Sequence, residues 1–220
     1  RQRQMCIRDR FPDMWKASKK YGVKIIYGEE GYLVNDVDGT LAVHGESDLP
    51  LDAEFVAFDI ETTGLHLDTN RMTEIGAVLF SGGEIKAEFD TFVNPHMPIP
   101  AEITELTGIS DETVADAPDL DEAVPKFLAW AGEGQYPLVA HNAGFDMGFL
   151  RTACKRLGIE REFTSIDTLE MSRLMLPHLH KFKLNILAKE LQVGPFEHHR
   201  ASEDAAVLGR IFVKLLARLK

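Results

Sequence analysis

The hydrophobic positions of the chain form short apolar runs in its middle part and helical patterns towards its end. Residues 54–60, EFVAFDI, are almost continuously apolar, which is typical of a central strand buried on both faces. Two further apolar runs, 73–80 and 84–93, are joined by the glycine-rich turn SGGE, and this pattern predicts a β-hairpin. Shorter apolar runs at 137–142 and 163–167 predict two more strands.

Helices are predicted where apolar residues recur at intervals of three and four. The predicted helices are residues 101–107, 119–131, 145–157, 168–176, 184–191 and 202–219. Strands therefore come first and helices later, which favours an α/β fold with a mixed sheet flanked by helices. We assign residues 51–220 to this domain.

The N-terminal part has a different pattern. Residues 1–10 show no helical or strand period, and we interpret them as an extraneous leader. Residues 11–50 contain the end of a helix that Gly22 stops, two short strands at 23–28 and 31–36, and a polar linker. This segment is too short to bury a core of its own, so we interpret it as a fragment of another domain.

Composition places the chain among globular proteins of a reducing compartment. Of its 220 residues 45% are hydrophobic, and no apolar run approaches the roughly 18 residues that a membrane span needs. The N-terminus has no apolar signal region, and the cysteines Cys6 and Cys154 do not form a disulfide framework. We therefore expect a cytoplasmic protein with no membrane partner.

The net charge of −11 argues at first against a nucleic-acid partner. The charge is unevenly distributed, however. From Leu174 to Lys220, eight basic residues outnumber four acidic ones, a balance of +4, whereas the rest of the chain holds 16 basic and 31 acidic residues. The acidic excess is compatible with a metal site, so charge alone does not decide the function.

The segment Asp59-Ile60-Glu61 is the strongest local signal. Alternation along a strand puts Asp59 and Glu61 on one face and Ile60 on the other. Two acids at the end of a buried strand need a positive partner, and a hard divalent cation with oxygen ligands provides one. The alternative is a pair of solvated acids where the strand leaves the sheet, and spacing alone does not separate the two.

A second acid, Asp146, lies in the first turn of the predicted helix that follows the strand PLVA. A carboxylate there also interacts favourably with the helix dipole, so by itself Asp146 has an ordinary structural explanation. Asp204 has a similar one, because Ser202 resembles an N-cap and Asp204 lies in the following turn. His199 lies in the preceding loop, where an imidazole of ordinary pKa suits general-base work near neutral pH.

Together these residues form a constellation of four carboxylates and one histidine at strand ends and helix starts. Such a set fits two Mg²⁺ ions about 3.5–4 Å apart, with Mn²⁺ as a substitute, acting in phosphodiester hydrolysis. His198 is a rival for the base, although its spacing to Asp204 fits less well.

The segments FDIETTGL, HNAGFDMGFL and HHRASEDA resemble, in the right order, the three motifs of the DEDDh exonuclease family. The resemblance runs from about Glu54 to the end of the chain and implies a ribonuclease-H-like α/β fold. The resemblance implies that Asp59, Glu61 and Asp204 bind the metals directly. It also implies that Asp146 acts through metal-bound water and that His199 is the base.

The same resemblance implies contacts to the 3′-terminal nucleotide. Thr62 would meet the nucleotide, Leu65 would wedge against the terminal base, and Phe145 would stack on it, with Asn142 as a further contact. Plain core packing is the competing explanation for Leu65 and Phe145.

Two other features have ordinary interpretations. His178 and His180 form only a weak zinc pattern, because no third ligand lies nearby. We expect these two histidines, together with Lys181 and Lys183, to face phosphates or solvent. Asp167 is expected to cap the helix that follows it.

Within the DEDDh family, NPHMPIPAEITELTGISDETVADAP is similar to the proofreading exonuclease of PolC-type DNA polymerase III alpha subunits. The upstream segment YGVKIIYGEEGYLVND resembles the PHP domain that the exonuclease interrupts there, with Glu30 at a metal-ligand position of that domain. The His-x-His ligands are absent, so Glu30 is expected to bind nothing. The resemblance implies two partners, a single-stranded or frayed primer 3′ end of DNA and the rest of the polymerase chain.

Two alternatives remain at this point. One is a different DEDDh enzyme, either stand-alone or linked to a helicase, that acts on RNA or DNA. The other is a non-catalytic nucleic-acid-binding module of the same fold. The PHP-like segment argues against the first, and the intact acids at all four positions argue against the second.

Overall fold

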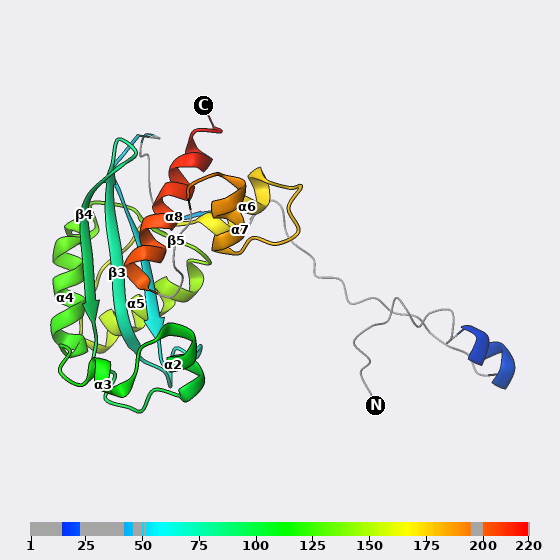
Figure 1. Cartoon of the computed structure of the whole chain (residues 1–220), viewed down its shortest axis with the longest axis horizontal. Coiled ribbons are helices and arrows are strands. Elements are labelled where there is room, and N and C mark those ends of the chain that lie inside the picture. The colour runs from blue at the N-terminus through cyan, green and yellow to red at the C-terminus, as the bar shows by residue number, and fades with distance from the viewer. Residues whose placement is uncertain (1–14, 23–41, 46–49, 51, 195–199, 220) are drawn as a thin grey trace. The chain divides into compact units, whose positions relative to one another are not determined.

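The structure, a computed structural model, describes residues 15–22, 42–45, 50, 52–194 and 200–219 (Figure 1). The chain divides into two compact units. These are Arg1–Gly39 and Thr40–Lys220.

In the first unit, residues 15–21 are helical and the chain turns at Gly22, whose φ of 63° lies in the left-handed region. This confirms the predicted helix stop, because glycine adopts that conformation without a steric penalty. The expected leader at 1–10, the two strands expected at 23–28 and 31–36, and Glu30 lie outside the described residues.

The second unit contains a six-stranded mixed sheet with the order β1-β6-β5-β2-β3-β4. Strands β2, β3 and β4 are antiparallel neighbours, β5 and β6 run parallel to β2, and β1 is antiparallel to β6. The strands are β1 (Val43–His44), β2 (Phe55–Thr62), β3 (Met72–Ser81), β4 (Glu84–Phe92), β5 (Leu138–Ala140) and β6 (Ser165–Asp167).

The helices follow the order that the sequence predicts, with two short additions. They are α2 (Ala101–Thr107), α3 (Asp111–Val114), α4 (Leu120–Trp130), the 3-10 turn η1 (Gly132–Gly134), α5 (Gly144–Arg156), α6 (Thr168–Met175), α7 (Leu184–Glu190) and α8 (Ala201–Leu216). The additions are η1 and α3, and α3 is a single turn that Ser110 and Thr113 stabilise through a reciprocal capping box. No helix among the described residues has the length and apolar character needed to cross a membrane.

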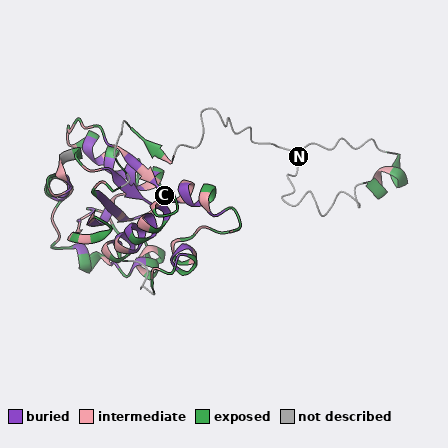
Figure 2. Cartoon of the chain, turned by 90° about the horizontal axis from the view of Figure 1, so that it is seen from above, coloured by how far each residue is buried: buried purple, intermediate pink, exposed green. Residues whose placement is uncertain are grey.

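Each face of the sheet is covered by its own set of helices. Figure 2 shows buried residues on the strands and on the helices around them. Strand β2 alternates between the two layers. Val56 and Phe58 pack in the cluster that contains α4 and α5, whereas Phe55 and Ala57 pack in the cluster that contains α6, α7 and α8. The alternation continues to the end of the strand, so Asp59 and Glu61 belong to the α8 side.

Helix α8 approaches β3 very closely at two glycines. A Cβ atom at Gly76 would come within 2.1 Å of the backbone of Ala201 and Ser202, and one at Gly209 would come within 2.1 Å of the Phe80 ring. Any larger residue would push the helix away from the sheet. Because Gly76 is the register partner of Asp59, this close approach brings the start of α8 to the acidic end of β2.

The sheet begins earlier in the chain than Leu51, the boundary expected from the sequence. Val43 and His44 pair with Ile166 and Ser165, so the compact unit starts at Thr40. A two-residue edge strand is too short to leave an alternating pattern from which it can be predicted.

Candidate active site

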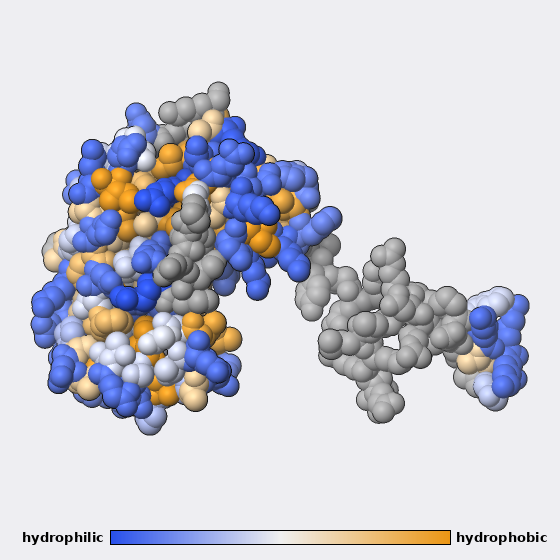
Figure 3. Space-filling view, in the orientation of Figure 1, coloured by the Kyte–Doolittle hydropathy of each residue, from blue (hydrophilic) through white to orange (hydrophobic). Residues whose placement is uncertain are grey.

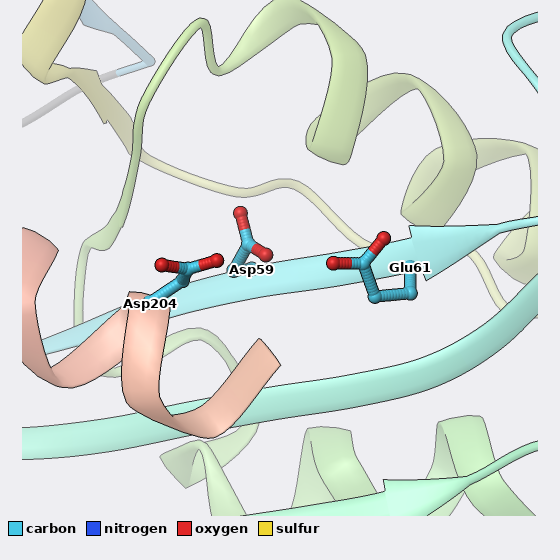
Figure 4. Close-up of side chains that lie close together, drawn as sticks. All are labelled: Asp59, Glu61 and Asp204. Carbon is cyan, nitrogen blue, oxygen red and sulfur yellow. The ribbon is translucent and has the colours of Figure 1, made fainter. Parts of the chain in front are cut away.

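Three carboxylates from distant parts of the chain meet above the end of β2. Asp59 and Glu61 project from the strand, and Asp204 projects from the first turn of α8 (Figure 4). One oxygen from each lies within 4.8 Å of the others, a spacing that allows all three to contact a single cation. The structure therefore brings together the two acids of the first motif and the acid of the third.

The start of α8 is held by Glu74, a residue that the sequence analysis did not single out. Glu74 is fully buried on β3, and its carboxylate accepts hydrogen bonds from Arg200 Nε at 3.1 Å and from the backbone N–H of Ala201 at 3.3 Å. Arg200 Nη2 lies 3.0 Å from the same carboxylate. The Glu74 carboxylate on β3 thus accepts a hydrogen bond from an N–H group that has no partner within α8. This contact positions Asp204, which lies in the first turn of the helix.

The expected N-cap at Ser202 is wrong. Arg200 occupies the N-cap position without a side-chain cap, and Ser202 lies inside the helix with its hydroxyl donating to Asp90 Oδ2 at 3.2 Å. The serine pattern suggested a local cap, but a buried acid from another strand provides the acceptor instead.

Asp146 reaches the same region from the other layer. It lies in the first turn of α5, is only 2% exposed, and accepts a hydrogen bond from the backbone N–H of Ile60 at 3.3 Å. Strand β5 pairs with β2 only at Val56 and Ala57, so the N–H of Ile60 lies beyond that ladder and Asp146 satisfies it. The fourth carboxylate is thereby fixed beside the strand that carries the first two.

The electrostatics of the site disfavour several ionised acids at once. Burial, followed by the charges of Asp146, Glu61 and Asp204, raises the pKa of Asp59 well above its ordinary value. Burial, with Glu74 and Asp204, raises the pKa of Glu61 to about 7.

Asp146 shows the same effect. Burial raises its pKa to about 8, although hydrogen bonds from its own backbone and from Ile60 oppose the shift. A desolvated acid cluster with these pKa values is stabilised by a hard divalent cation, which prefers oxygen ligands. The donor set therefore fits a divalent metal centre.

The turn that leads into α5 is tied to the β6–α6 junction. The backbone N–H groups of Asn142 and Ala143 donate to Asp167 Oδ1 and Oδ2, each at 3.0 Å. Asp167 Oδ1 also accepts from the N–H of Leu169 at 2.8 Å, so the helix cap predicted for Asp167 is confirmed. Asn142 has a φ of 66°, a conformation that asparagine tolerates better than most residues.

The expected nucleotide contacts differ in their surroundings. Leu65 is 76% exposed in the loop after β2, so core packing does not explain it. Phe145 is partly buried and its ring lies 5.1 Å from that of Phe149, which makes core packing at least part of its role. The hydroxyl of Thr62 donates to Gly64 O at 2.7 Å, and Asn142 is exposed.

His199, the predicted base, and its rival His198 lie outside the described residues. Glu74 and Gly76 are the site-forming residues that the sequence analysis missed. An acid within the apolar run TEIGAVLF was the available signal for Glu74, because a charged residue on a central strand needs a buried partner.

A protein-family model described as Exonuclease matches residues 56–212. The PolC-type DNA polymerase III of Caldanaerobacter subterraneus subsp. tengcongensis is 49% identical over 210 residues, which cover 96% of this chain and 15% of that protein. The PolC-type DNA polymerase III of Bacillus cereus is 44% identical over 208 residues, 94% of this chain and 14% of that protein. The chain thus spans only about one seventh of the length of these relatives.

Among solved structures, one described as exonuclease X in complex with 5′ overhanging duplex DNA superimposes with a TM-score of 0.62 and 25% identity. The match covers 74% of this chain and 92% of that chain. The mixed sheet flanked by helices is therefore the fold of a known exonuclease.

Proposed function

Because the chain belongs to the exonuclease family whose model spans residues 56–212, we propose that it is the proofreading segment of a PolC-type DNA polymerase III. Its activity is the stepwise removal of nucleotides from the 3′ end of DNA, on a single-stranded or frayed primer. The observation that carries the proposal is the convergence of Asp59, Glu61 and Asp204 within 4.8 Å, with Asp146 buried beside them. Similarity to polymerases over 96% of the chain supports the polymerase context.

We further propose that Asp59, Glu61 and Asp204 hold two Mg²⁺ ions directly, with Mn²⁺ as a substitute, and that Asp146 acts through water. When bound, such ions lower the pKa of a water molecule and stabilise charge on the phosphate and on the leaving 3′ oxygen. The carboxylates hold this arrangement in place, because β2 sets the spacing of two of them and Glu74 fixes the helix that carries the third.

His199 is the proposed base, and its imidazole removes the proton from the attacking water. It directly precedes Arg200, whose guanidinium is bound to buried Glu74. Arg200, the residue that follows His199 in the sequence, is therefore anchored to β3. Thr62, Leu65, Asn142 and Phe145 are the proposed contacts of the terminal nucleotide.

Residues 11–50 are proposed to belong to an interrupted PHP domain. The polymerase relatives match 94–96% of the chain, so the similarity extends into this segment. By this proposal the segment contributes to the assembly of the larger protein and not to the chemistry at the acids.

The direct test is digestion of a 5′-labelled single strand by the purified chain. With Mg²⁺ present, the labelled products should form a ladder that shortens from the unlabelled 3′ end, and EDTA should abolish it. The Asp204→Asn variant should be inactive, whereas Glu203→Gln, an exposed acid one residue away, should retain activity as the matched control. Immediate release of labelled mononucleotide, or an active Asp204→Asn variant, would contradict the proposal.

A further inference from the structure

An open groove of about 660 Å³ lies between α6, the following loop and the start of α7. Its wall begins at His141 and Asn142, in the turn that leads into α5, and continues to Arg173, Lys181 and Lys183. Figure 3 shows a mainly hydrophilic surface over α6 and α7.

The charge of this groove is opposite to that of the whole chain. Three basic side chains and two histidines line it, and none of its lining residues is acidic, although the chain carries a net charge of −11. Arg173 forms an ion pair with Glu170, which reduces its contribution. Lys181 and Lys183 are exposed and pair with no acid in the described part of the chain, so they can bind an anion.

The loop that carries Lys181 and Lys183 is hydrogen-bonded to the turn that precedes α5. His141 Nε2 lies 2.7 Å from the carbonyl oxygen of Phe182, the residue between the two lysines, and His141 Nδ1 lies 3.0 Å from Thr168 Oγ1. A carbonyl can only accept, so the Nε2–H of His141 donates to Phe182. Burial lowers the pKa of His141, which favours the neutral ring, and both the neutral Nε2–H ring and the protonated ring can donate to this carbonyl.

We propose that this groove binds the backbone phosphates of single-stranded DNA on the 5′ side of the scissile bond, through Lys181 and Lys183. The inference rests on the proposed function. The terminal nucleotide lies at the acids, so the rest of the strand must leave the site in the 5′ direction. The groove starts at Asn142, four residues before Asp146, and lysines in a groove without acids attract phosphates independently of base sequence.

The experiment compares two substrates in the Lys181→Gln/Lys183→Gln variant. One is a 5′-labelled single-stranded 20-mer, and the other is the p-nitrophenyl ester of thymidine 5′-monophosphate, which has no upstream phosphates. Lys189→Gln is the matched control, because Lys189 is exposed on α7 but does not line the groove.

For the 20-mer, KM should rise roughly tenfold while kcat changes little. The slope of log KM against log salt should fall by about 1.4, which is about 0.7 for each of two lost phosphate contacts to a single strand. Hydrolysis of the ester should be unchanged. An unchanged KM and salt slope for the 20-mer, or an equal loss on both substrates, would overturn the proposal.

A binding measurement separates this proposal from the exonuclease assignment. Fluorescence anisotropy with a 5′-fluorescein single strand in EDTA needs no catalysis. Weaker binding by the double variant than by Lys189→Gln would support the groove even if the ester were not hydrolysed. Equal binding by the two would refute the groove even in an active enzyme.

Discussion

Replacing Glu61 with glutamine should stabilise the metal-free protein while destroying its activity. Burial and the charges of Glu74 and Asp204 raise the pKa of Glu61 from 4.5 to about 7. Because the pKa of Glu61 is higher in the folded state than in the unfolded state, its contribution to stability is fully present only below the unfolded pKa of 4.5. This contribution is lost as the pH rises through the folded-state pKa of about 7. The ionised carboxylate therefore destabilises the metal-free fold at neutral and alkaline pH.

The size of the effect follows from the shift. A pKa difference of about 2.5 units corresponds to about 3 kcal/mol at pH 8, at 1.36 kcal/mol per unit, but to less than about 1 kcal/mol at pH 5. Glu61→Gln removes the charge and keeps the shape, so at pH 8 in EDTA it should unfold roughly 5–10 °C higher than the wild type. Active-site residues often destabilise the fold, so replacing one can raise stability while lowering activity.

The assays are thermal unfolding and urea denaturation, both followed by circular dichroism, in EDTA, at pH 5 and pH 8. Glu203→Gln is the control, because it makes the same charge change at an exposed position of α8 and should stay within about 0.5 kcal/mol of the wild type. Mg²⁺ should stabilise the wild type at pH 8 more than it stabilises the variant. A variant that is no more stable than the wild type at pH 8, or whose gain is as large at pH 5, would refute the reasoning.

Three further changes test other parts of the site. His199→Ala should lower kcat by about 10²–10⁴-fold, with partial recovery at high pH and a smaller loss for His198→Ala, and a reversal of the two phenotypes would move the base by one residue. Glu74→Ala should lower the free energy of unfolding by about 2–4 kcal/mol in urea titrations, because it leaves Arg200 and a helix-start N–H without their buried acceptor. Deletion of residues 1–39 should leave the rate of 3′-end digestion within several-fold, and a complete loss of activity would show that this unit is needed for the chemistry.

Local pattern alone predicted most of the secondary structure and part of the site. The apolar run at residues 54–60 predicted a strand, and this was enough to put Asp59 and Glu61 on one face at its end, because side chains alternate in any strand. The position of Asp146 in the first turn of a helix also followed from the neighbouring residues. Three motifs in order then identified the chemistry, although none of them was specific by itself.

Tertiary structure decided how these pieces meet. Nothing near Asp204 in the sequence indicates that α8 is capped by Glu74, which is 127 residues from Ala201, or that Gly76 allows the helix to approach β3. The same holds for the pairing of β1 with β6 and for the hydrogen bond from Ile60 to Asp146. Periodicity reports which face of its own element a residue lies on, whereas the partner across the sheet depends on packing between distant segments, and only the folded chain specifies that packing.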